Sequence, residues 1–167
     1  MKLRKIRLIN WHQFWDNTIE IENNTLLTGD NGSGKSTLLD AIFFVLSGGE
    51  NKRFNKAANE ESIRTLESYM RGKLGVEGKE YLRDVKDYPD IISHIALEFV
   101  SENSKNSTII GCVLELNGVG NAKPKFYIID NIPLTDLKLE VDKQISDSDK
   151  LKEFYGNIFI EMNKSKR

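Results

Sequence analysis

Residues 29–36 read Gly-Asp-Asn-Gly-Ser-Gly-Lys-Ser, which matches the phosphate-loop pattern G-x-x-x-x-G-K-[ST] in full. The three glycines allow backbone conformations that a Cβ would forbid, so successive N–H groups can point toward a phosphate. Lys35 is a mobile cation that reaches β- and γ-phosphates, and the Ser36 hydroxyl is a hard oxygen ligand that suits Mg²⁺. The pattern therefore predicts a site for a nucleotide and Mg²⁺.

A strand before the loop and a helix after it are needed to hold these residues. Thr25–Thr28 is short, β-branched and apolar, which predicts a strand that runs directly into the loop. A helix is predicted from Lys35 to Ser47, stopped by Gly48-Gly49, and its N-terminus would add positive potential at the phosphates. Its expected buried stripe is Leu38, Leu39, Ile42, Phe43 and Leu46. The expected nucleotide-binding residues are Gly29, Asp30, Asn31, Gly32, Ser33, Gly34, Lys35, Ser36 and Thr37.

The remaining pattern predicts an α/β protein in which antiparallel strands flank the loop and its helix. Alternation predicts strands over Leu3–Ile9 and Thr18–Glu22, with a polar and aromatic turn over Asn10–Asn17. Helical spacing over Ser62–Arg71 ends at Gly72. Three later runs predict an added antiparallel β patch: Ile91–Val100, Thr108–Leu116 and Phe126–Ile129. The acidic stretch Asp130–Glu153 is interpreted as a solvated loop with a short helix.

Composition excludes several classes of protein. The 167 residues suit one domain, and 24 basic against 25 acidic side chains exclude a globally basic nucleic-acid binder but not a locally basic face. The longest apolar run, Ala41–Leu46, is too short to cross a membrane, and the N-terminus lacks the pattern of a secretory signal. The single cysteine, Cys112, cannot form an internal disulfide, so we expect a cytoplasmic location.

The position of the loop favours one class of P-loop protein. Small nucleoside kinases place the loop after the first strand, whereas about 28 residues with two further strands precede it here, as is typical of ABC-type ATPases. No N-K-x-D motif supports a GTPase. A self-contained P-loop kinase remains an alternative, with Arg64 and Arg71 as the helical pair that would have to serve as lid arginines.

Several stretches resemble the N-terminal head segment of SMC-type ATPases: Ile9–Phe14, the loop from Thr28 to Thr37, and Leu38–Ala41. Phe54–Asn59, Ser68–Lys73 and Ile95–Phe99 also resemble the MukB-like branch, in particular JetC, the SMC-like subunit of Wadjet anti-plasmid systems. The similarity extends to about Ile132 and then fades.

This resemblance implies the N-terminal half of an ABC-type head. Residues 1–132 would form the half-head, and residues 133–167 an acidic loop and short helix leading toward a coiled coil. The C-terminal half would carry the Walker B acid, the catalytic glutamate and the signature motif, none of which occurs in this chain. No catalytic residue is therefore assigned here, and the chain alone is expected to bind ATP and Mg²⁺ without turning ATP over.

The resemblance also implies partners and two further site residues. The partners are the C-terminal half of the same head, a second SMC-like head that dimerises with ATP, kleisin-type and accessory subunits, and the DNA backbone without sequence specificity. His12 stands where related double-strand-break repair ATPases carry an arginine, near the phosphates or adenine; a surface histidine is the alternative. Gln144 and Gln13 are the only glutamines, so either could serve as the Q-loop residue that contacts Mg²⁺ and the attacking water; Gln144, beyond the predicted β patch, is the candidate assigned to that role.

Two interpretations remain open for the segment between residues 52 and 86. Nine basic and six acidic side chains leave a net charge of +3. An ordinary mixed surface and a surface that contacts DNA phosphates both fit this composition. A nucleotide-gated assembly module without chemistry of its own is a further alternative for the whole chain.

Overall fold

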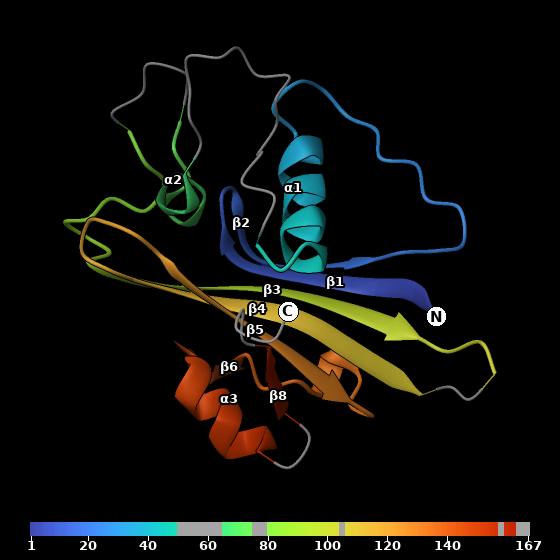
Figure 1. Ribbon diagram of the computed structural model, residues 1–167. Coiled ribbons are helices and arrows are strands. Elements are labelled where there is room, and N and C mark those ends of the chain that lie inside the picture. The colour runs from blue at the N-terminus through green and yellow to red at the C-terminus, as the bar shows by residue number, and fades with distance from the viewer. Residues whose placement is uncertain (50–64, 75–79, 104–105, 157–158, 163–167) are drawn as a thin grey trace.

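The computed structural model describes residues 1–49, 65–74, 80–103, 106–156 and 159–162, which are organised around one antiparallel sheet (Figure 1). The strand order in this six-stranded sheet is β2-β1-β3-β4-β5-β8. Its strands are β1 (Lys2–Trp11), β2 (Phe14–Glu20), β3 (Asp90–Val100), β4 (Ser107–Asn117), β5 (Lys123–Asp130) and β8 (Phe159–Met162).

The predicted lead-in strands and the predicted β patch form a single sheet. They are joined because β1 pairs with β3, with Ile6 opposite Leu97 and Leu8 opposite Ile95. The three antiparallel strands of the predicted patch are confirmed, but their continuity with the lead-in strands was not predicted, because pairing across about 90 residues leaves no local signal. The second strand also begins at Phe14, because Trp11 and Phe14 pair across a tight turn.

Both faces of the sheet are covered (Figure 1). Helices α1 (Lys35–Leu46) and α2 (Leu66–Arg71) lie on one side, here called the α1 face. The other side, the α3 face, carries η1 (Leu134–Asp136), the hairpin β6 (Glu140–Val141) and β7 (Gln144–Ile145), and α3 (Ser148–Tyr155). Alternate residues of each central strand therefore enter two separate cores.

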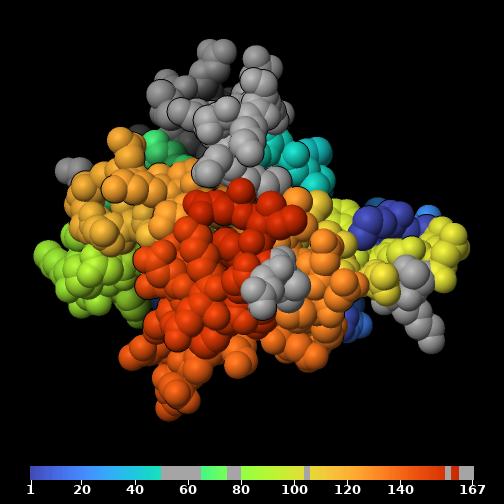
Figure 2. Space-filling model, turned by 60° about the horizontal axis from the view of Figure 1, so that its bottom comes forward, coloured from blue at the N-terminus to red at the C-terminus, as the bar shows by residue number. Residues whose placement is uncertain are grey.

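The acidic stretch after β5 is part of the α3-face core. Leu134, Leu137, Leu139 and Leu151 are at most 2% exposed and pack against sheet residues such as Ile129. Figure 2 shows this stretch, in orange and red, spread across that face of the molecule. A short helix was correctly expected, but the expectation of a solvated loop is wrong because these four leucines anchor the stretch to the sheet.

Helix α1 has the predicted start but a different buried stripe. Thr37, Leu38, Ala41, Phe44 and Val45 face the sheet. Of the predicted stripe, three residues are instead exposed, namely Leu39, Phe43 and Leu46. The helix is apolar on most of its surface, so periodicity alone could not identify the side that meets the sheet.

The glycines that follow the two helices end them as predicted. The N–H of Gly49, whose φ is 74°, donates to Phe44 O at 2.9 Å behind α1. Gly72, with a φ of 68°, ends α2. Helix α2 begins after Thr65, whose side chain caps it; the predicted start at Ser62 lies outside the described residues. None of the helices in the described ranges has the length and apolar character needed to span a bilayer.

His94 is fully buried on the α3 face, and its Nε2 contacts Ser146 O at 2.7 Å. Burial lowers the pKa of His94 to about 4, from an ordinary value of 6.5. Between these two values the unfolded chain binds a proton that the folded chain does not bind. The free energy of unfolding is therefore fully retained above about pH 6.5 and falls as the pH drops toward 4.

We predict that His94 accounts for about 1 kcal/mol of lost unfolding free energy between pH 7.5 and pH 5.5. His94→Gln keeps a side-chain donor for Ser146 O but removes the titration. Urea denaturation at the two pH values should show a smaller pH-dependent loss in this variant than in the wild type. Identical losses in the two proteins would exclude His94 as the source.

Candidate nucleotide-binding site

The phosphate loop has the backbone geometry that its sequence predicts. Gly29, Gly32 and Gly34 have φ values of 145°, 86° and 96°, in the region that favours glycine. A Cβ on Gly34 would lie 2.6 Å from Gln13 Nε2 and 3.1 Å from Phe14 Cζ. The loop thus lies directly against the β1–β2 turn, and a side chain at Gly34 would occupy the space between them.

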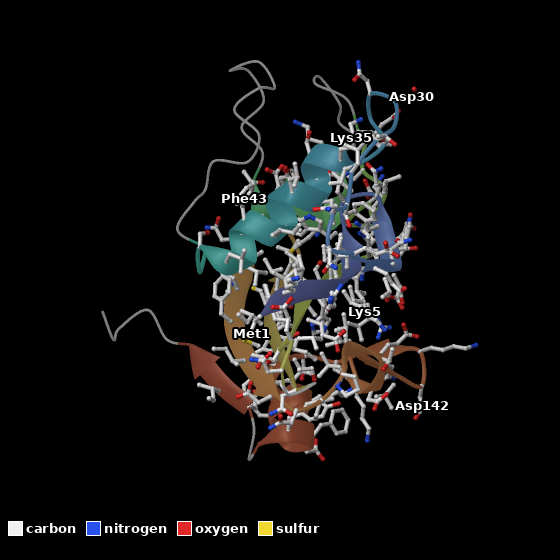
Figure 3. All side chains as sticks on the ribbon, turned by 90° about the vertical axis from the view of Figure 1, so that its right-hand side faces the viewer. Met1, Lys5, Asp30, Lys35, Phe43 and Asp142 are labelled. Atoms are coloured by element: carbon white, nitrogen blue, oxygen red, sulfur yellow. The ribbon has the colours of Figure 1, made fainter. Side chains whose placement is uncertain are left out.

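Lys35 is held inside the loop by oxygen atoms. Its Nζ donates to Gly29 O at 2.6 Å, to Asp30 O at 2.9 Å and to Ser33 Oγ at 3.3 Å. Figure 3 shows Asp30 and Lys35 together at the N-terminal end of α1. The ammonium group is therefore held by oxygen atoms of the loop that leads into the helix, and a phosphate bound in this loop would meet both the cation and the helix N-terminus.

A pocket of about 250 Å³ forms where the loop and the β1–β2 turn meet. Seven of the nine predicted residues line it, namely Asn31, Gly32, Ser33, Gly34, Lys35, Ser36 and Thr37. The two others, Gly29 and Asp30, supply the carbonyls that hold Lys35. A cation, a hydroxyl and the start of a helix converge here, and this chemistry fits the phosphates of ATP with Mg²⁺ on Ser36.

His12 and Gln13 bring the β1–β2 turn into the same pocket. Gln13 Nε2 donates to Gly32 O at 3.3 Å, so the amide group lies beside the loop. His12 has a φ of 49°, and its N–H donates to Tyr69 O at 2.6 Å, which fixes the turn against α2. The sequence had offered Gln13 as one of the two possible Q-loop glutamines, and Gln13 is the one that lines this pocket.

The structure does not bring Gln144 to the phosphate loop. Gln144 begins β7 on the α3 face, where it lines a different groove and accepts a hydrogen bond from Lys150 Nζ at 3.3 Å. Figure 3 shows Asp142, from the same hairpin, across the sheet from Lys35. Of the two glutamines, only Gln13 lines the phosphate-loop pocket.

Trp11 is a core residue at the end of β1. It is fully buried, its ring stacks on Tyr69 at a centroid distance of 4.6 Å, and its Nε1 donates to Thr37 O at 3.1 Å. It therefore positions α1 and is not available to stack on adenine. Phe14 packs against the same core.

The strand predicted before the loop is not formed. Thr25–Thr28 has no regular secondary structure and pairs with no strand within the described residues, and Leu26 is 84% exposed. The apolar sequence is suited to a sheet, yet a strand needs a neighbour that supplies hydrogen bonds. The described part of the chain places none beside it.

The basic segment contains two arginines that are structural. Arg71 is 3% exposed and Arg83 is 0% exposed, and both donate to backbone carbonyls. Neither can serve as a lid arginine or contact DNA at the surface. Five other basic residues lie outside the described ranges: Lys52, Arg53, Lys56, Arg64 and Lys79.

Comparisons with known proteins agree with this geometry. Residues 3–61 match the family described as the P-loop containing region of AAA domain. The chain is also similar to the DNA double-strand break repair Rad50 ATPase of Sulfolobus acidocaldarius, with 34% identity over 87 residues. This match covers 50% of the chain but 10% of the archaeal protein. The chain thus carries a P-loop ATPase region similar to that of a Rad50 ATPase, and its α/β arrangement fits a P-loop NTPase.

We predict that Gly34→Ala lowers the free energy of unfolding by about 1 kcal/mol more than Gly32→Ala does. Both variants place a Cβ at a positive φ, but only the Cβ at position 34 meets Gln13 and Phe14; nothing lies within 4 Å of one at position 32. Thermal or urea unfolding of the two variants measures the difference. Equal destabilisation would show that the turn does not press on the loop.

Proposed function

We propose that this chain is the ATP-binding N-terminal half of an SMC-like ATPase head that acts on DNA. The observation that carries the proposal is the phosphate loop at the start of α1, with Lys35 inside it and the β1–β2 turn against it. The match of residues 3–61 to a P-loop region and the similarity to a protein named as a DNA-repair ATPase support the choice of ATP and DNA.

In this proposal each side chain of the pocket has a defined task. The loop amides and Lys35 hold the β- and γ-phosphates, and the Ser36 hydroxyl binds Mg²⁺, which neutralises charge on the same oxygens. Gln13 presents its amide beside Gly32, where it orients the Mg²⁺-bound phosphate or a nearby water. His12 lines the same pocket and contacts the nucleotide there.

An apolar surface next to the site supports a composite head. Leu39, Phe43 and Leu46 are 42%, 60% and 53% exposed on one side of α1, and the segment Thr25–Thr28 lacks a neighbouring strand in the described part of the chain. Apolar side chains at this spacing suit burial against another element. We infer that the C-terminal half of the same head covers them and supplies the groups that activate the attacking water.

The more specific parts of the proposal rest on the resemblance of the sequence to SMC-type ATPases. They are membership of the MukB-like branch near JetC, ATP-dependent dimerisation with a second SMC-like head, kleisin-type and accessory subunits, non-specific contact with the DNA backbone, and a cytoplasmic location. Whether the system defends against plasmids or organises chromosomes depends on those partners.

The self-contained kinase is not favoured. It needs mobile arginines over the phosphates, but the Nε of Arg71 lies 3.1 Å from Glu67, and its Nη1 donates to the carbonyls of Arg83 and Tyr88. The other alternative, a nucleotide-gated assembly module without chemistry of its own, can be distinguished by an activity measurement. Adding the C-terminal head half should produce ATP hydrolysis if the chain is half of an ATPase head, and no hydrolysis if it is such a module.

We predict that the chain binds Mg·ATP and that Lys35→Ala weakens this binding at least about tenfold, since a charge-assisted contact to phosphate is lost. Lys123→Ala, which removes an exposed lysine on β5, is the matched control and should bind as the wild type does. Calorimetric titration measures all three proteins. Equal heats for the wild type and Lys35→Ala would refute nucleotide binding at the loop.

The two glutamines give a second, internally matched test. Gln13→Ala should weaken Mg·ATP binding about fivefold, because a hydrogen bond to a charged group contributes on the order of 1 kcal/mol. Gln144→Ala, across the sheet, should leave the affinity within about twofold of the wild type. A larger effect of Gln144→Ala would reassign the Q-loop role to that residue.

A further inference from the structure

Two arginines lie buried beside each other near the end of β1, and they differ in how their charges are satisfied. Arg71 is paired with Glu67, and its two terminal nitrogens donate to the carbonyls of Arg83, Tyr88 and Gly118. Arg83 donates from Nε to Met70 O at 2.6 Å and from Nη2 to His12 O. Its Nη1 is buried without a hydrogen-bond partner among the described residues.

Arg83 also lacks a counter-charge. No ion pair joins it to a carboxylate within the described part of the chain, and its guanidinium carbon lies 4.6 Å from the centre of the Trp15 ring. Burial lowers the pKa of Arg83 to about 10, so the group is still cationic at neutral pH. A buried cation with an unpaired nitrogen is costly unless an anion completes it.

Arg83 lines a groove of about 790 Å³ between the start of β3 and the β6–β7 hairpin. Lys143 and Lys150 line the same groove, and neither is in an ion pair within the described ranges. Lys143 lies in the tight turn between β6 and β7, with a φ of 63°. Two lysines and the buried arginine thus converge on one hollow from different elements.

Two carboxylates also line the groove, and one of them is already engaged. Asp147 caps α3 by accepting a hydrogen bond from Lys150 N at 2.8 Å. Asp90 lies at the first residue of β3 and is exposed. Three cations against two carboxylates leave the groove with a net charge of +1, and the buried member of the set is a cation.

We propose that this groove binds the phosphate group of a small phosphorylated ligand, with Lys143 and Lys150 as its direct contacts and the buried charge of Arg83 adding positive potential to the same hollow. Two flexible ammonium groups beside a fixed buried cation suit a tetrahedral, multiply charged oxyanion. The volume exceeds that of a phosphate alone and lies within the range of small-molecule sites. Tyr88, 41% exposed and part of the same lining, offers a ring against which the rest of such a ligand can pack.

This site is separate from the phosphate loop. The two sets of lining residues have no member in common, and the groove includes the β6–β7 hairpin on the α3 face, whereas the loop begins α1. Binding in the groove therefore does not depend on ATP binding at Lys35. Absence of ATP binding at the phosphate loop would leave the proposed phosphate site in the groove untouched, and the reverse also holds.

The test uses amide-resolved NMR on the Lys35→Ala protein, so that the loop does not compete for phosphate. Titration with inorganic phosphate, and separately with adenosine 5′-monophosphate, should give saturable shifts of the signals of residues 143–147 and of the Arg83 Nε–H. Equal affinities would define a phosphate site alone, and tighter binding of the nucleotide would add a contact to the rest of the ligand. Either result supports the proposal.

The charge-removing double variant Lys143→Gln/Lys150→Gln should weaken binding at least about tenfold while leaving the buried Arg83 framework intact. Lys123→Gln is the control and should change nothing. Shifts that do not saturate, or that have the same dissociation constant in the double variant, would overturn the proposal. Shifts confined to residues 31–37 would assign the phosphate to the loop and also overturn it.

Discussion

The packing of Trp11 between the sheet and two helices is the contact on which the nucleotide site depends. Its indole N–H donates to Thr37 O in the first turn of α1, and its ring stacks on Tyr69 of α2. Tyr69 in turn donates from its hydroxyl to Asp40 of α1, and its carbonyl accepts from His12 N. A single buried side chain therefore fixes the end of β1, the start of α1 and the β1–β2 turn relative to one another. A phosphate-binding pocket tolerates little displacement of the residues that line it. The contacts of Trp11 therefore hold the loop and the turn in the positions that form the pocket.

The continuous sheet explains how the two candidate sites come to lie where they do. One face carries α1 and the phosphate loop, and the other carries the β6–β7 hairpin and α3. Since β1 and β3 are neighbours, the end of β1 reaches both: His12 and Gln13 line the phosphate-loop pocket, and Asn10 lines the groove. Arg83 donates to the carbonyl of His12 and links these regions through the backbone.

Local sequence patterns predicted what depends on local geometry. The phosphate loop, the start of α1, the glycine stops at Gly49 and Gly72 and the three strands β3, β4 and β5 follow from turn chemistry and periodicity. Contacts between distant segments were not predictable in this way. Examples are the pairing of β1 with β3, the choice of buried side on the apolar helix α1, and the burial of Leu134 and Leu151 in an acidic stretch. The same limit explains Gln13 and Gln144, since only the fold shows which glutamine lies at the loop.

Amide hydrogen exchange of the wild-type chain, with and without Mg·ATP, tests most directly whether the loop and the β1–β2 turn bind the nucleotide together. We predict slower exchange in the presence of the nucleotide at residues 12–13 and 31–37, because ligand, loop and turn form one unit joined through Trp11. Protection of the loop without the turn would contradict the proposed role of the β1–β2 turn. Unchanged exchange at residues 31–37 under saturating Mg·ATP would contradict the nucleotide site itself.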